Sequence, residues 1–162
     1  SINNYILNNN LNAQSTASGL HYVIYNQGTG ETPTIYSDVT VAYKGYLTNG
    51  AIFDESSSSG VSFPLSNVIE GWQEGIPLFS EGGSGILLIP SALGYGSESV
   101  GSIPENSVLI FDISKALLSK INLVYSVSSS AANTAFSATP LTLNVLVANL
   151  RALATSSELQ KA

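Results

Sequence analysis

The sequence of 162 residues contains no cysteine and no methionine. Without cysteine the chain forms no disulfide and has no thiol chemistry, so composition does not fix its redox compartment. Methionine is missing even at position 1, which indicates a longer precursor that lost a signal peptide, or a shortened gene. Uninterrupted apolar runs of about 18 residues are also missing, so no transmembrane helix of the usual length is expected.

Charge is scarce as well, because only 10% of the residues are Asp, Glu, Lys or Arg, against roughly 25% in ordinary soluble domains. Five Lys and Arg residues against eleven Asp and Glu residues give a net charge of -6. Such a surface repels nucleic acid and anionic lipid, so neither is expected as a partner. Low charge with abundant Ser and Asn favours a periplasmic or extracytoplasmic location, where a lipidated segment upstream of Ser1 would provide an anchor.

Motifs for metal binding, phosphate binding and nucleophilic catalysis are missing too. His21 is the single histidine and falls inside a predicted strand, where we expect a structural role. The glycine-rich stretches 28–30 and 82–85 have no following lysine and no strand–loop–helix setting, so we interpret them as turns. We therefore expect no metal and no cofactor.

Four acidic residues of the central part are candidates for acid–base catalysis, because paired carboxylates can act as general acid and base. They are Asp54, Glu70, Glu74 and Asp112. Nothing in their spacing brings two of them together in a sugar-binding cleft. We interpret them as solvated or hydrogen-bonded acids.

An apolar fraction of 44% over this length supplies one domain with a real core, plus an extension. Alternating apolar residues, with Val39, Val41, Tyr43 and Gly45 on one face, predict strands. The predicted strands cover residues 20–25, 38–47, 51–54, 84–89 and 108–113. Asn49 and Gly50 indicate a tight hairpin between the second and third strands.

A short helix is predicted over residues 68–75, capped by Ser66 or Asn67. Gly71 and Gly75 weaken this helix but permit close packing beneath Trp72. The predicted fold is α+β: a twisted antiparallel sheet wrapped around one short α-helix.

Both ends of the chain differ from this central part. Residues 1–18 predict a short helix near 2–9 and a linker, with a disordered leader as the alternative. Residues 122–162 form a C-terminal extension whose segment after Pro140 fits a helix or an alternating strand, and whose apolar surface needs a cover. The expected domains are therefore 1–18, 19–121 and 122–162.

Aromatic residues recur in the central part without a nucleophile or metal ligands nearby. Tyr95 lies between two glycines on the long loop 90–107, and long loops in compact domains are usually functional. Aromatics most often form plain core, but this context favours an apolar pocket that works by shape.

Several sequence blocks around these aromatics occur in a specific order. The blocks are residues 41–47, 50–54, 63–65, 68–72, 94–96, 103–104 and 109–112. In this order the chain resembles the FKBP-type peptidyl-prolyl cis–trans isomerases over about residues 19–121. The resemblance implies an antiparallel sheet curled around a short helix, in line with the fold predicted from the pattern.

The resemblance also implies a proline-binding pocket with Trp72 as its floor. Tyr95 would donate its hydroxyl to a substrate carbonyl, and Ile103 would cover the bound peptide. The implied catalytic residues are Tyr95, Asp54 and Tyr43. The implied substrate-binding residues are Phe53, Val61, Phe63, Val68, Ile69, Trp72, Ile103 and Phe111. The chain departs from many members in having Val61 where they have an aromatic, and in lacking a histidine or aromatic over residues 97–102.

Two functions follow as hypotheses. The first is a peptidyl-prolyl isomerase that assists the folding of extracytoplasmic proteins, acting non-covalently on proline-containing polypeptides. The second is an FKBP-like binding module that serves as a chaperone or accessory subunit of an envelope or secretion assembly. In that case, the N-terminal segment or residues 122–162 would contact the partner complex.

Overall fold

A computed structural model describes residues 1–118 of the chain. The predicted extension, residues 122–162, lies outside the described residues. The helices are α1 (Ile2–Asn8) and α2 (Glu70–Gly75), and the short 3-10 helices are η1 (Leu65–Asn67), η2 (Ile76–Leu78) and η3 (Ser91–Leu93). The strands are β1 (Gln14–Ser15), β2 (His21–Asn26), β3 (Asp38–Leu47), β4 (Ile52–Glu55), β5 (Val61–Pro64), β6 (Ser84–Ile89) and β7 (Leu109–Leu118).

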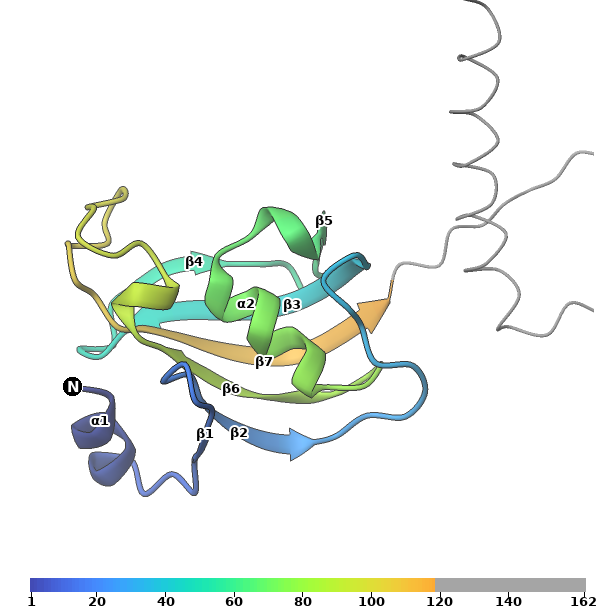
Figure 1. Cartoon of the computed structure of the whole chain (residues 1–162), viewed down its shortest axis with the longest axis horizontal. Coiled ribbons are helices and arrows are strands. Elements are labelled where there is room, and N and C mark those ends of the chain that lie inside the picture. The colour runs from blue at the N-terminus through green and yellow to red at the C-terminus, as the bar shows by residue number, and fades with distance from the viewer. Residues whose placement is uncertain (119–162) are drawn as a thin grey trace, which may run out of the picture. The chain divides into compact units, whose positions relative to one another are not determined.

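The strands form one antiparallel sheet in the order β1-β2-β6-β7-β3-β4, and β5 pairs with the first part of β3, Asp38 to Val41. Figure 1 shows α2 lying across one face of the curled sheet, so the predicted α+β architecture is confirmed. Strand β7 lies between β6 and β3 and places Phe111 opposite both Leu87 and Gly45. The central strands thereby fix the positions of residues that are distant in sequence.

The predicted strands are all present: 38–47 and 84–89 have the predicted bounds, and the ends of the others shift by one residue, except the C-terminal end of β7. Strand β7 extends further than predicted, to Leu118, because it pairs with β3 as far as Val39. Two strands were not predicted: β1, which contains two residues, and β5, which pairs Phe63 with Val39. At the predicted hairpin, Gly50 alone takes positive φ and its N–H donates to Leu47 O at 2.8 Å.

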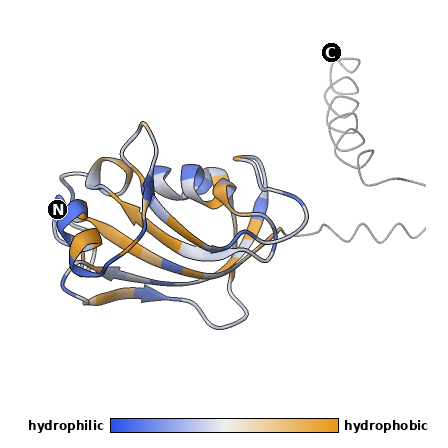
Figure 2. Ribbon diagram, turned by 90° about the horizontal axis from the view of Figure 1, so that it is seen from below, coloured by the Kyte–Doolittle hydropathy of each residue, from blue (hydrophilic) through white to orange (hydrophobic). Residues whose placement is uncertain are grey.

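The two faces of the sheet carry two separate apolar clusters, visible as orange segments in Figure 2. Along β6, Leu87 and Ile89 belong to the main core with Trp72 of α2. Their neighbours Ile86 and Leu88 face the other side, where Ile2 of α1 joins them. The period-two alternation of a strand explains why adjacent residues serve different clusters.

The N-terminal helix predicted near residues 2–9 is confirmed as α1. The Ser1 hydroxyl caps it by accepting a hydrogen bond from Asn4 N at 3.4 Å. A helix of seven residues is marginal by itself in water, so it depends on the contact of buried Ile2 with the sheet. The expected linker after α1 includes β1.

The predicted cap of α2 is wrong. Ser66 and Asn67 belong to η1, and the N-cap of α2 is Ile69, which has no side-chain capping bond. A side chain of α2 holds the link between η1 and α2. Gln73 Nε2 donates to Val68 O at 2.8 Å and to Ser66 O at 3.3 Å. Gln73 thus holds two carbonyl groups of the link, but it supplies no acceptor for the first N–H groups of α2, so the expected side-chain cap is absent there.

Glycines allow α2 to approach β6 closely, as predicted. A Cβ at Gly71 would lie 2.8 Å from Cδ1 of buried Ile89, and a Cβ at Gly75 would lie 2.7 Å from Cδ1 of Leu87. Larger residues at either position would push the helix off the sheet. No helix within residues 1–118 is long and apolar enough to cross a membrane.

We predict that Gly71→Ala destabilises the fold by up to about 2 kcal/mol, because an overpacking cost of about 1–3 kcal/mol outweighs the roughly 1 kcal/mol gain in helix propensity. Ile89→Ala alone should cost about 2–5 kcal/mol. The double variant should cost at least about 0.5 kcal/mol less than the sum of the two, since the small residue removes the overlap. Urea unfolding of the four proteins measures this coupling, and strict additivity would contradict the proposed contact.

Candidate functional site

An aromatic cluster lies between α2 and the strands β3, β4, β5 and β7. Trp72 is 4% exposed and packs edge-on against Tyr43 (ring centroids 4.9 Å apart) and Phe111 (5.1 Å). Phe63 lies 5.3 Å from Trp72, and Phe53 lies 5.5 Å from Phe111. Such contacts contribute about 0.5–1.5 kcal/mol each beyond area burial, so the ring positions are well fixed.

The exposed side of this cluster forms a pocket with a volume of about 550 Å³. This volume lies within the range of small-ligand sites. The pocket is lined by Tyr43, Phe53, Asp54, Val61, Phe63, Asn67, Val68, Ile69, Trp72, Tyr95, Val100, Gly101, Ser102, Ile103 and Phe111. All eleven residues proposed from the resemblance are among them, and the roles assigned to these residues remain predictions.

Four lining residues were not among those proposed from the sequence: Asn67, Val100, Gly101 and Ser102. Three of them belong to the long loop, where an isolated bridge between Val100 and Ile103 folds the chain back over the pocket. The glycine- and serine-rich composition of this loop was the available signal, but it did not specify which positions face the pocket.

Gly45 makes room for the pocket wall. A Cβ on this residue of β3 would lie 2.6 Å from Phe53 Cε2 and 2.9 Å from Phe111 Cε1. The rings of Phe53 and Phe111 therefore occupy space that any side chain at position 45 of β3 would fill.

The polar groups of the pocket are few, and two of them are bonded to each other. The Tyr43 hydroxyl donates to Asp54 Oδ2 at 2.5 Å, and the backbone N–H of Glu55 donates to Asp54 Oδ1 at 2.9 Å. These bonds fix the carboxylate at the edge of the pocket. The Tyr95 side chain is 38% exposed and lines the same pocket.

Burial raises the pKa of Tyr43 well above its ordinary value of 10, and the hydrogen bond and negative charge of Asp54 raise it further. The hydroxyl therefore stays protonated over the whole physiological range. Tyr43 is thus a fixed hydrogen-bond donor and has no role as a base.

The lining residue Trp72 has one unusual property. The indole Nε1 of Trp72 is buried and has no hydrogen-bond partner among the described residues. Buried polar groups are normally paired, and exceptions are found at functional sites. Trp72 therefore holds one buried, unpaired donor in an otherwise apolar ring.

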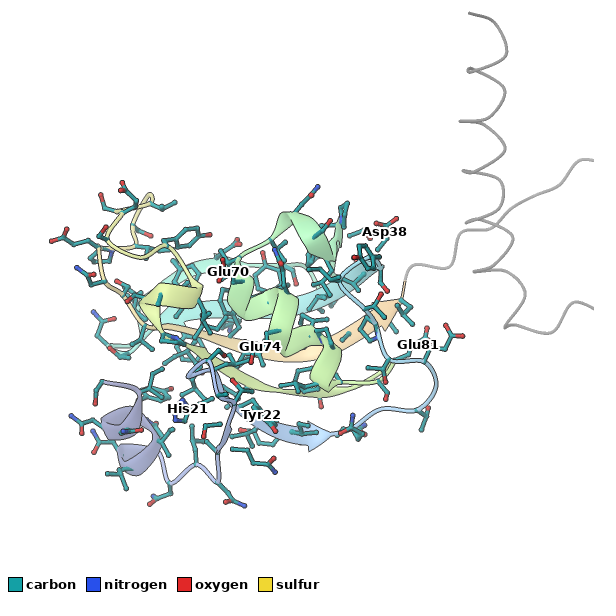
Figure 3. All side chains as sticks on the ribbon, in the orientation of Figure 1. His21, Tyr22, Asp38, Glu70, Glu74 and Glu81 are labelled. Carbon is teal, nitrogen blue, oxygen red and sulfur yellow. The ribbon has the colours of Figure 1, made fainter. Side chains whose placement is uncertain are left out.

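The other chemistry-bearing residues lie outside this pocket. His21 and Glu74 are labelled in Figure 3, and His21 lies on β2, on the other side of β6 and β7 from β3. Glu74 accepts a hydrogen bond from Ser18 Oγ at 2.6 Å, and Asp112 accepts one from the Tyr46 hydroxyl at 3.1 Å. Residues 1–118 contain no group of His, Asp and Glu side chains able to hold a metal ion.

The family comparison identifies the same part of the chain. Residues 29–114 match the profile of the family described as FKBP-type peptidyl-prolyl cis-trans isomerase. A probable FKBP-type peptidyl-prolyl cis-trans isomerase FkpA of Neisseria meningitidis is 48% identical over 103 residues, which are 62% of this chain and 38% of the relative. The FkpA of Escherichia coli K12 is 42% identical over 102 residues, again 62% of this chain and 38% of the relative. The matches thus cover about two fifths of these relatives.

Solved structures agree with the fold. The crystal structure of FkpA from Escherichia coli has a TM-score of 0.62 and 40% identity, covering 65% of this chain and 50% of that one. A peptidyl-prolyl cis-trans isomerase from Pseudomonas syringae has a TM-score of 0.61 and 29% identity, covering 72% of this chain and 86% of that one.

We predict that Tyr43→Phe weakens the loss of stability at alkaline pH. In the unfolded chain tyrosine ionises near pH 10, whereas folded Tyr43 keeps its proton, so the unfolded state binds fewer protons above that pH. The raised pKa of Tyr43 therefore contributes to the free energy of unfolding. This contribution is complete below about pH 10 and is lost as the pH rises towards the raised pKa. Tyr43→Phe removes it, so stability should fall less steeply with pH.

Urea unfolding between about pH 8 and pH 11.5 measures this slope. Tyr36 is 92% exposed, and Tyr36→Phe is the matched control. Equal slopes for Tyr43→Phe and Tyr36→Phe would contradict the prediction.

Proposed function

Because the chain belongs to the FKBP-type peptidyl-prolyl cis-trans isomerase family, we propose that its pocket catalyses the isomerisation of X–Pro bonds in polypeptides. The observation that carries this proposal is the apolar pocket on Trp72, whose size and open side suit a proline ring. The proposal concerns residues 1–118, since the matched curated relatives are much longer than the matching region.

The reaction requires a pocket and no reactive group. Twisting an X–Pro bond breaks amide resonance, and the barrier of about 18–20 kcal/mol makes the uncatalysed process take about 10–100 s. The twisted amide has less charge separation than the planar amide, so it loses less on leaving water. An apolar pocket therefore binds the transition state more strongly than the ground state, which is the requirement for catalysis.

The lining residues take the following roles in this proposal. The proline ring rests on Trp72 between the walls formed by Tyr43, Phe53 and Phe111. Tyr95 donates its hydroxyl to a carbonyl of the client next to the proline and holds it as the bond rotates. Asp54 keeps Tyr43 in place through the 2.5 Å hydrogen bond, and Ile103 covers the bound peptide.

The remaining apolar lining residues complete the ring-binding surface. These are Val61, Phe63, Val68 and Ile69. We place this activity in an extracytoplasmic compartment, where it would assist protein folding; the low charge and the Ser- and Asn-rich surface support this setting.

We predict that the chain accelerates cis–trans isomerisation of a short proline peptide and that Tyr95→Phe lowers kcat/KM by about 3- to 30-fold. The loss corresponds to one hydrogen bond of roughly 0.5–2 kcal/mol in the transition state. Asp54→Val and Trp72→Ala should lower it further, because they remove the support of Tyr43 and the floor of the pocket. A protease-free fluorescence assay measures the rates.

The control for Tyr95→Phe is Tyr36→Phe, which removes a hydroxyl from a fully solvated side chain and should retain wild-type activity. Circular dichroism checks that each variant is folded. If the wild-type chain isomerises the peptide no faster than buffer does, the enzymatic proposal is wrong.

A further inference from the structure

We infer that this pocket prefers client segments with a lysine or arginine next to the proline, an inference that rests on the proposed function. The pocket itself binds the apolar ring. The charges around its opening decide which neighbouring residue is favoured.

One lining residue carries a full charge at neutral pH. Among the fifteen residues that line the pocket, Asp54 is the one acidic or basic residue, and the others are apolar or uncharged. Asp54 is exposed, and its two described hydrogen bonds come from neutral donors, the Tyr43 hydroxyl and the Glu55 N–H. Neutral donors orient the carboxylate and leave its negative charge in place.

The one lysine beside this carboxylate is already paired. Lys44 lies opposite Glu55 in the β3–β4 ladder, next to the pair formed by Gly45 and Asp54. Its Nζ lies 3.1 Å from Glu55 Oε1. The positive charge is therefore matched by Glu55, and the charge of Asp54 is left over.

The segments that continue from the lining residues add further carboxylates. Glu98 lies between Tyr95 and Val100, and its N–H donates to Tyr95 O at 3.1 Å. Glu105 follows Ile103 by two residues, and the next residue, Asn106, donates its N–H to Gly96 O at 2.8 Å. These bonds close the loop over the pocket and keep both exposed carboxylates on it.

A third carboxylate, Glu70, adjoins a different lining segment of the same pocket. It follows Ile69 directly and begins α2 (Figure 3). Acidic residues therefore adjoin the lining residues in two segments, the start of α2 and the loop 90–107.

The rest of the folded part has the same sign. Residues 1–118 contain ten Asp and Glu residues against two lysines, Lys44 and Lys115, a difference of eight negative charges. A cleft with low-dielectric walls and one sign of charge concentrates the potential and attracts the opposite charge. The effect of exposed charges is screened over about 8–10 Å, so it acts on residues beside the proline and depends on salt.

The test uses the full chain and three short peptides that differ only in the residue before proline: Lys, Gln or Glu. At about 20 mM salt we expect kcat/KM to follow the order Lys, Gln, Glu, with about a 3- to 10-fold difference between the first and the last. At about 500 mM salt the difference should shrink towards one.

A variant pair assigns the effect to the loop. The double variant Glu98→Gln/Glu105→Gln should reduce the Lys-to-Glu ratio by about half or more and leave the Gln peptide unchanged. The matched control is Glu31→Gln/Glu81→Gln, with the same change in net charge. Glu81 lies by Val39 and Leu118, at the other end of the sheet from loop 90–107 (Figure 3). This control should retain the wild-type ratio.

The two proposals fail in different ways. If none of the three peptides is accelerated, the isomerase function itself is wrong. If all three are accelerated equally at low salt, the activity stands and the preference for cations is overturned. If the control variant lowers the ratio as much as the loop variant, the preference comes from overall charge and the assignment to the pocket opening is overturned.

Discussion

The close approach of α2 to the inner face of the sheet is the contact on which the pocket depends. It is possible because Gly71 and Gly75 leave no side chain between the helix backbone and the side chains of Ile89 and Leu87. At this distance Trp72 reaches the aromatic rings of the strands and is almost fully buried. Side chains at positions 71 and 75 would hold the helix further from the sheet and weaken the contacts between the indole and these rings.

The same packing gives the molecule both its core and its proposed binding surface. Trp72 belongs to the main apolar cluster with Leu87 and Ile113, and it also lines the pocket. The pocket is therefore formed before any client arrives, and little ordering of side chains is needed on binding. Changes that loosen the core should also reduce the affinity for the transition state.

Charge and apolar surface are separated in the pocket. Most lining residues are aromatic or aliphatic, and the Tyr43 hydroxyl donates to Asp54. Carboxylates lie at the edge and on the segments that lead away from it. In the proposed function, a neutral ring binds inside the pocket and charge acts only beside it, so the chemistry of isomerisation is separate from the choice of client.

Local pattern in the sequence was sufficient for the main elements. The alternation along residues 38–47 and 84–89 predicts β3 and β6, because one face of each strand must be apolar. Long-range contacts decided the rest. Strand β5 exists because Phe63 pairs with Val39, and α2 starts after Ile69 because Ser66 and Asn67 belong to the preceding helix η1.

The site divides in the same way. Residue order and spacing were enough to propose eleven pocket residues through a family resemblance, and all of them line one cavity. The sequence could not indicate that Asn67, Val100, Gly101 and Ser102 face the same space, because their positions depend on how the loop folds back between Val100 and Ile103. Nor could it indicate that Lys44 is paired with Glu55, which leaves Asp54 as the uncompensated charge. Sequence determined which residues are available for chemistry; tertiary structure decided their neighbours, because strand pairing and loop closure join residues that local pattern treats separately.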